Sequence, residues 1–172
     1  MIDITNRDNA IKIKDQYDYI IGFVDCDSGD ETSVSGVNDI HHIDDIGNTT
    51  HSHYKVLKSD VTYAENIVVP NYKNMELLIN HSIARAITQK DVLYWCSAGI
   101  SRSATAAFIH KCLATNAIDF TFFNKKYLPQ THMLYYASGV LGMPYLYAGC
   151  IDWWENIKTN KDYSSLKINY GE

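Results

Sequence analysis

Short apolar runs alternate with segments of helical spacing along this chain, and that alternation constrains the fold more than any other feature. Three runs predict buried strands, at residues 19–25, 37–43 and 91–96. Helical spacing predicts amphipathic helices over 71–88, with Asn71 as N-cap, and from Arg102 to about Ala117. Short buried strands between helices favour an α/β fold, a three-layer sandwich with a mostly parallel central sheet.

The rest of the chain shows no division into parts. Residues 131–141 have helical spacing, and a final helix is predicted to begin at Asp152. The segment from about 158 to 172 is polar and is expected to be a loosely held tail. A length of 172 residues without internal repeats predicts a single domain spanning 1–172.

Composition and charge exclude several classes of protein. Hydrophobic residues make up 46% of the chain and charged residues 20%, which is typical of a globular core. The net charge of −5 argues against nucleic acid or an anionic membrane as a partner. The first residues lack the basic and apolar regions of a signal peptide, so the protein is expected in the cytoplasm.

The four cysteines are far apart and contain no CxxC pair, which argues against a disulfide framework or a zinc knuckle. Cys112 and Cys150 are interpreted as small buried apolar residues. Cys26 is interpreted in the same way, with a redox partnership with Cys96 as the alternative. Only Cys96 has a local sequence that favours a reactive thiol.

A histidine-rich segment raises the question of a metal site. His41 and His42 precede Asp44 and Asp45, with His51 and His53 close behind. These side chains are suitable metal ligands, but their spacing matches no compact ligand motif. Exposed loop histidines are the favoured interpretation, and neither a metal nor a cofactor is predicted.

The residues around Cys96 predict a site for an anion. Cys96 and Arg102 lie six positions apart, between a predicted strand and a predicted helix, and the residues between them are Ser97, Ala98, Gly99, Ile100 and Ser101. Such a loop can direct successive backbone N–H groups, and the positive end of the following helix, at one phosphate. Gly99 permits a positive φ, and the Arg102 guanidinium can hold two phosphate oxygens. These groups also favour the nucleophilic thiolate of Cys96, to which Ser103 can donate a hydrogen bond.

This string, Cys-x-Ala-Gly-x-Ser-Arg-Ser, resembles the phosphate-binding loop of cysteine-based protein tyrosine and dual-specificity phosphatases. A later Pro-x-x-x-Met-Leu segment, beginning at Pro129, is similar to that of small bacterial and phage members. The resemblance implies a tyrosine-phosphatase-like fold and attack of Cys96 on the phosphate of a phosphorylated protein or peptide, with phosphotyrosine as the expected substrate. Water would then hydrolyse a phosphocysteine without a metal. The oligomeric state is left open.

The family's general acid is an aspartate on a loop upstream of the signature. Asp45 is the first choice because it follows a predicted strand and Gly47 can serve as a hinge. Asp44 is an alternative, and Asp60, 36 residues before Cys96, is the main rival.

One residue departs from the family pattern. Trp95 precedes the nucleophile, where the family has histidine. This departure favours a first alternative, a catalytically weak or inert module that binds phosphoprotein. A second alternative is sulfur transfer or arsenate reduction, because an anion site with a thiolate suits that chemistry as well.

Overall fold

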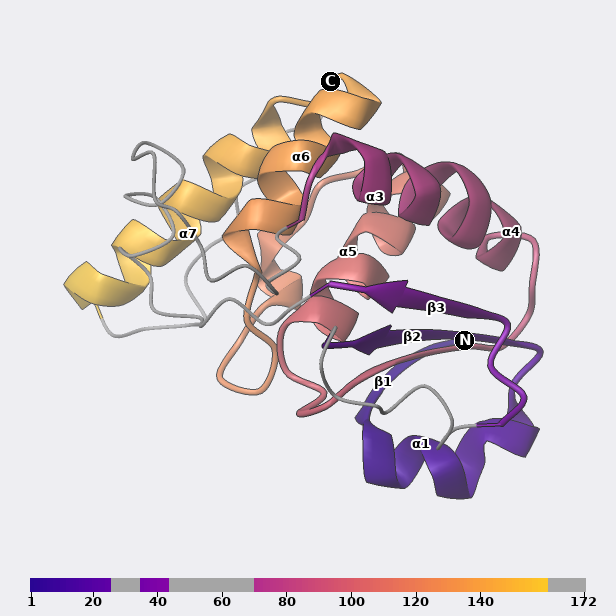
Figure 1. Ribbon diagram of the computed structural model, residues 1–172. Helices are drawn as coiled ribbons and strands as arrows, with labels where there is room; N and C mark the ends of the chain where they lie inside the picture. The colour runs from indigo at the N-terminus through magenta and orange to yellow at the C-terminus, as the bar shows by residue number, and fades with distance from the viewer. Residues whose placement is uncertain (26–34, 44–69, 161–172) are drawn as a thin grey trace.

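A parallel sheet forms the centre of the computed structural model, which describes residues 1–25, 35–43 and 70–160. In this part of the chain four strands run in one direction, in the order β1-β4-β2-β3 (Figure 1). The strands are β1 (Ile2–Asn6), β2 (Tyr19–Val24), β3 (Asp39–His42) and β4 (Val92–Cys96). The predicted α/β class and parallel sheet are confirmed, and all four carboxyl ends lie at the same edge.

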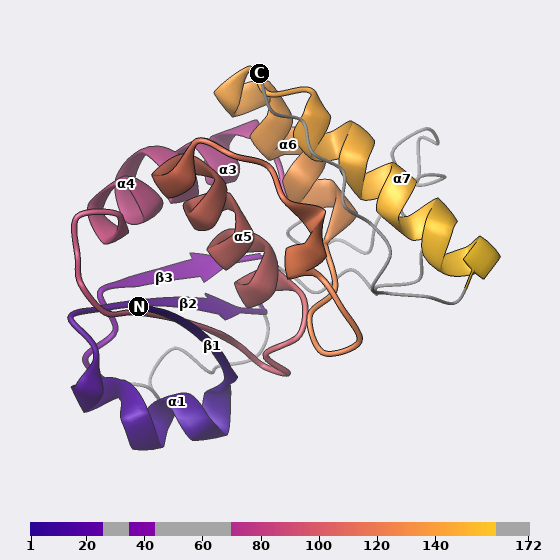
Figure 2. The same cartoon turned by 180° about the vertical axis from the view of Figure 1, so that it is seen from behind.

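Helices cover both faces of the sheet. In both views α1 lies on one face, whereas α3, α4 and α5 lie on the other, with α6 and α7 beyond them (Figures 1 and 2). The helical elements are α1 (Arg7–Ile13), η1 (Lys14–Gln16), α3 (Tyr72–Leu77), η3 (Leu78–Ile83), α4 (Ala84–Ala86), α5 (Arg102–Thr115), η4 (Phe120–Phe122), α6 (Thr131–Leu141) and α7 (Tyr145–Asn160). No helix within these described residues combines the length and apolarity needed to cross a bilayer.

Strand alternation divides the core between the two faces. Ile21 and Phe23 of β2 pack in the larger cluster with Cys96 of β4. Ile20 of β2 packs in the smaller cluster with Trp95 of β4, against α1. Successive side chains of a strand point to opposite faces, so Trp95 and Cys96 lie on opposite sides of the sheet.

Most predicted elements are present, with some changes of extent. The helix predicted over 71–88 begins after Asn71, whose side chain accepts a hydrogen bond from the Asn74 N–H in a capping box, but its middle is the π-helical segment η3. The α6 helix matches its predicted range. The final helix begins at Tyr145 rather than at Asp152 and continues through Asn160, so residues 158–160 are helical. The rest of the predicted tail, 161–172, lies outside the described residues.

The first strand and helix were not predicted from the sequence. In β1, Ile2 and Ile4 pack against the core, but an asparagine, an aspartate and a threonine interrupt the apolar pattern. The following helix α1 has only seven residues and begins after Asn6, whose side chain accepts a hydrogen bond from the Asn9 N–H. Both elements are too short for periodicity to identify them.

Trp95 occupies its position only because residue 22 is glycine. A Cβ atom on Gly22 would lie 2.4 Å from Cζ2 of the indole, which is 1% exposed and enclosed by the smaller cluster. We expect Gly22→Ala to lower the free energy of unfolding by about 1–3 kcal/mol, because the indole has no space into which it can shift. Urea denaturation monitored by circular dichroism measures this loss.

The double variant Gly22→Ala/Trp95→Leu provides the control. Removing the distal ring atoms relieves the clash, so the effects of the two substitutions should be non-additive, and alanine at position 22 should cost less when leucine is at position 95. An equal cost of Gly22→Ala in both backgrounds would contradict this packing.

Candidate functional site

The candidate loop connects β4 to α5, as the sequence predicted. Cys96 is the last residue of β4 and Arg102 is the first residue of α5. Cys96 is only 1% exposed and Arg102 is fully buried, whereas Ser97, Ala98 and Ile100 are exposed. The two side chains with expected chemical roles thus lie at the base of the loop, and its outer residues face solvent.

Two groups of the loop approach the sulfur of Cys96. The Gly99 N–H donates a hydrogen bond to Sγ over 3.2 Å. Ser103 Oγ lies 3.2 Å from the same sulfur. When the sulfur is a thiolate, both groups act as donors to it. One group from the loop and one from α5 therefore lie against the sulfur of Cys96.

Gly99 makes the curled loop compatible with the neighbouring strand. Its φ of +69° lies in the left-handed region, where a side chain is strained. An ideal Cβ would also lie 2.5 Å from the carbonyl carbon of Thr5 and 2.6 Å from the backbone nitrogen of Asn6. The loop therefore rests directly on the carboxyl end of β1.

Arg102 is held by groups from other strands. Its Nη1 donates to Asp25 Oδ1 over 2.7 Å and to the Ile43 carbonyl over 2.6 Å. Its Nη2 donates to Ser97 Oγ over 3.4 Å. These contacts hold the guanidinium at the carboxyl edge of the sheet, beside the loop.

Sequence reasoning missed Asp25 and Ile43. Asp25 directly follows β2 and Ile43 directly follows β3, and Cys96 ends β4, so the parallel sheet places all three at the same edge. Side chains at the carboxyl ends of parallel strands commonly form the sites of α/β proteins. An acidic residue immediately after a buried strand was the available signal for Asp25.

The outer side of the loop is held by the chain that precedes α6. The Leu128 N–H donates to the Ile100 carbonyl over 3.0 Å. The Ser101 carbonyl instead accepts from the Thr105 N–H over 2.8 Å, in the first hydrogen bond of α5. The loop leads directly into the N-terminus of the 14-residue helix α5, whose dipole favours an anion at this end.

Trp95 contributes to the core rather than to the loop. Its indole packs in the cluster on the α1 face, opposite to the side chain of Cys96. Its Nε1 has no hydrogen-bond partner among the described residues. The phosphatases that this loop resembles have histidine at this position. Here the Trp95 side chain makes no hydrogen bond to any described residue of the loop.

Cys112 and Cys150 are buried free thiols, as predicted. Burial raises the pKa of the Cys112 thiol to about 12 and that of the Cys150 thiol to about 12. Both therefore remain protonated and poorly nucleophilic at neutral pH. Cys26, the proposed redox alternative, lies outside the described residues.

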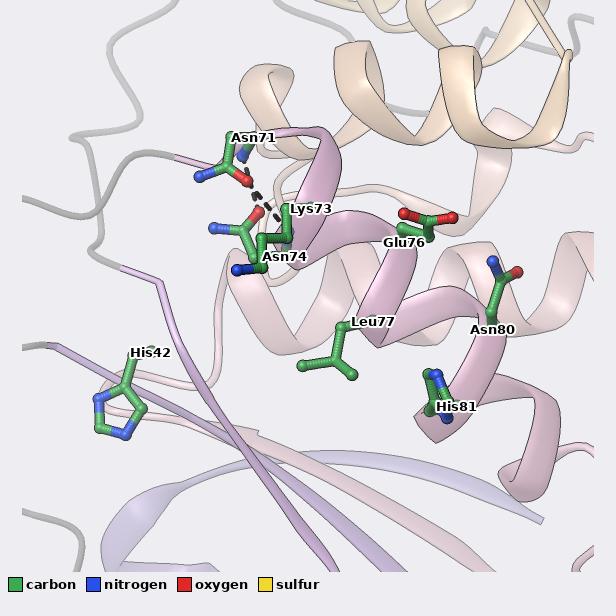
Figure 3. A pocket seen from close by; sticks show the side chains of 8 residues that line it. All are labelled: His42, Asn71, Lys73, Asn74, Glu76, Leu77, Asn80 and His81. Atoms are coloured by element: carbon green, nitrogen blue, oxygen red, sulfur yellow. Dashed lines mark hydrogen bonds between the residues drawn. The ribbon is translucent and has the colours of Figure 1, made fainter.

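His41 and His42, the described histidines of the histidine-rich segment, lie in different surroundings. His41 is 5% exposed, with Nε2 2.8 Å from Ser82 Oγ, and burial lowers its pKa to about 4. The exposed-loop interpretation is therefore wrong for His41, because β3 turns this side chain into the core. His42 and His81 both line a cavity of about 460 Å³, and the two imidazole rings lie well apart from each other (Figure 3). Within the described ranges, no three metal-ligating side chains form a group.

The candidate acids Asp44, Asp45 and Asp60, together with His51 and His53, lie outside the described residues. Among the described residues, Asp25 is the carboxylate that forms an ion pair with Arg102.

Comparison of the chain with protein-family models, with curated proteins and with solved structures finds no match. The residues of the loop and of the sheet edge are therefore the basis for assigning a function.

The contact between Gly99 and β1 predicts that adding a methyl group at position 99 lowers the free energy of unfolding more than at another glycine of positive φ. Gly142 has a similar φ of +64°, but nothing lies within 4 Å of its Cβ position. We expect Gly142→Ala to cost about 1 kcal/mol of stability from backbone strain alone. Gly99→Ala should cost about 2–4 kcal/mol, because strain and overpacking against backbone combine. Urea denaturation of both variants measures the difference, and equal losses would contradict the contact.

Proposed function

We propose that this protein is a cysteine-dependent phosphatase with a tyrosine-phosphatase-like fold that hydrolyses phosphotyrosine in proteins, with dual specificity as an extension of the same chemistry. The observation that carries the proposal is the arrangement around Cys96. Donors from Gly99 and Ser103 lie 3.2 Å from its sulfur, and the buried Arg102 is held at the same edge of the sheet.

In the first step, the Cys96 thiolate attacks phosphorus opposite to the bond to the tyrosine oxygen. Backbone N–H groups of residues 97–102 and the Arg102 guanidinium bind the phosphoryl oxygens, so their charge is compensated as the bond breaks. The leaving oxygen takes a proton from an acid, for which Asp45 is the candidate. The products of this step are the free tyrosine and a phosphocysteine.

In the second step, water attacks the phosphocysteine and releases inorganic phosphate. The sulfur is now the leaving group and becomes a thiolate again. The Ser103 hydroxyl and the Gly99 N–H are placed to stabilise it by donating hydrogen bonds. The same two groups therefore serve both halves of the reaction, and no metal is required.

The burial of Cys96 beneath the exposed Ser97, Ala98 and Ile100 is the feature that favours phosphotyrosine in this proposal. Cys96 is 1% exposed at the base of the loop. A phosphate on a phenol projects farther from a peptide backbone than a phosphate on serine or threonine. The longer side chain therefore reaches this sulfur with less rearrangement of the loop.

The chemical proposal is tested by hydrolysis of para-nitrophenyl phosphate between pH 5 and 8 in the presence of a chelator. We expect Cys96→Ser to abolish turnover, because the hydroxyl is a far weaker nucleophile. Cys112→Ala is the matched control, because it removes a buried thiol of α5 and should leave turnover unchanged. Asp45→Asn should reduce turnover about 100-fold or more through loss of the acid.

Two results would contradict the proposal. One is full turnover by the Cys96→Ser variant, and the other is no turnover by folded protein under any of these conditions.

Asp25 is proposed as a positioning residue for Arg102, acting through their 2.7 Å ion pair. We expect Asp25→Asn to raise KM for a phosphotyrosine peptide about threefold to tenfold with a smaller change in kcat, because the guanidinium is held less firmly before phosphate binds. Asp25→Glu should recover part of the loss, and Asp15→Asn, an exposed charge change on η1, should have no effect. An unchanged KM in Asp25→Asn would refute this role.

A second function is favoured by Trp95, a module that binds phosphoproteins without hydrolysing them. The Trp95 indole makes no hydrogen bond to a described residue of the loop. In this proposal the thiolate therefore relies on the backbone N–H groups, Ser103 and Arg102. Tight binding of a phosphotyrosine peptide that is recovered intact after prolonged incubation would select this function over the enzyme.

A further inference from the structure

A cavity of about 480 Å³ adjoins the loop on the side of β1. Ala98, Gly99 and Ile100 of the loop line it together with the end of β1 and with α1. The strand order β1-β4-β2-β3 places this cavity on one side of β4, whereas Asp25 and Ile43 follow β2 and β3 on the other. An anion bound by the loop would therefore have Arg102 on one side and this cavity on the other.

The cavity carries two ammonium groups from separate parts of the chain. Lys12 comes from α1 and Lys126 from the segment that precedes α6, and both side chains are exposed. The ammonium of Lys126 lies 4.8 Å from the centroid of the Tyr127 ring, which restricts where it extends. Asp8 also lines the cavity, so the charge of its lining is +1 in a protein whose net charge is −5. A local excess of positive charge beside an anion-binding loop is suited to a second anionic group.

The polar side chains of Thr5, Asn6 and Asn9 also line the cavity, together with Ile4. Asn9 Nδ2 donates to Thr5 Oγ1 over 2.8 Å, and the Asn9 N–H donates to Asn6 Oδ1 over 2.9 Å. These hydrogen bonds fix the amide side chains that line the cavity, and amides suit an extended peptide backbone. The volume lies within the range of ordinary ligand pockets, about 300–1,000 Å³.

We propose that this cavity binds an acidic side chain of the substrate peptide close to the phosphotyrosine, with Lys12 and Lys126 as its specificity-determining residues. The inference rests on the proposed function and names the substrate class of that site. The loop is shared between the two subsites, so a peptide lying across it presents phosphate to Cys96 and a carboxylate to the lysines. A phosphotyrosine peptide without a flanking carboxylate retains the phosphate contacts but lacks the contact with Lys12 and Lys126.

The test compares two phosphotyrosine peptides, one with aspartates flanking the phosphotyrosine and one with alanines there. Fluorescence anisotropy with the full-length Cys96→Ser protein measures binding without turnover. We expect the aspartate peptide to bind about threefold to tenfold more tightly at low salt, and this preference to decline as the salt concentration rises. Lys12→Ala/Lys126→Ala should abolish the preference.

The matched control is Lys90→Ala/Lys111→Ala, which removes two exposed lysines from a different cavity. It should leave the preference intact. In protein with Cys96 present, Lys90→Ala/Lys111→Ala should also leave turnover of para-nitrophenyl phosphate unchanged, because neither lysine lines the cavity beside the loop. Equal binding of the two peptides, or a preference that survives Lys12→Ala/Lys126→Ala, would overturn the inference alone. Absence of binding by both peptides would overturn the proposed function and this inference with it.

Discussion

The candidate site depends on one buried charge. Arg102 is fully buried, and burying a guanidinium is costly unless partners compensate for the lost water. Asp25 supplies the opposite charge and Ile43 supplies a carbonyl, at 2.7 and 2.6 Å from Nη1. These partners follow β2 and β3, and Ser97, which follows β4, accepts from Nη2. The arginine therefore connects three strand ends to the start of α5. The loop shape, the position of the sulfur and the edge of the sheet are thereby coupled.

A second constraint acts from the opposite side of the loop. Gly99 packs directly against the backbone of Thr5 and Asn6, and a Cβ atom at position 99 would overlap with these backbone atoms. Its N–H is the group that donates to Cys96 Sγ. The contact with β1 therefore supports the orientation of a donor to the Cys96 sulfur. Phosphate chemistry benefits from such fixed donors, because they need no reorganisation when charge develops.

The strand–loop–helix unit of the candidate site could be predicted from the sequence because its residues are contiguous in the chain. Cys96, Gly99 and Arg102 lie within one strand–loop–helix unit, and the apolar run before it and the helical spacing after it identify that unit without tertiary information. The α6 helix was also predicted from the helical spacing of its own residues. The parallel sheet followed from strands that alternate with helices.

Features that depend on distant contacts were not predictable in this way. Asp25 reaches Arg102 only because β2 and β4 pair, and the sequence separation of 77 residues hides that contact. His41 was interpreted as exposed together with the other histidines of its segment, yet strand alternation turns it into the core. The short elements β1 and α1 are stabilised by packing and by pairing with β4, and their own sequence has too little periodicity to show them.

The central claim is that Cys96 becomes covalently phosphorylated during turnover. Rapid acid quenching of the protein during hydrolysis of a phosphotyrosine peptide, followed by proteolysis and mass spectrometry, tests it directly. We expect phosphate on the peptide that contains Cys96, present during turnover and lost when substrate is exhausted. Turnover without phosphate on Cys96, or a persulfide in its place, would contradict it.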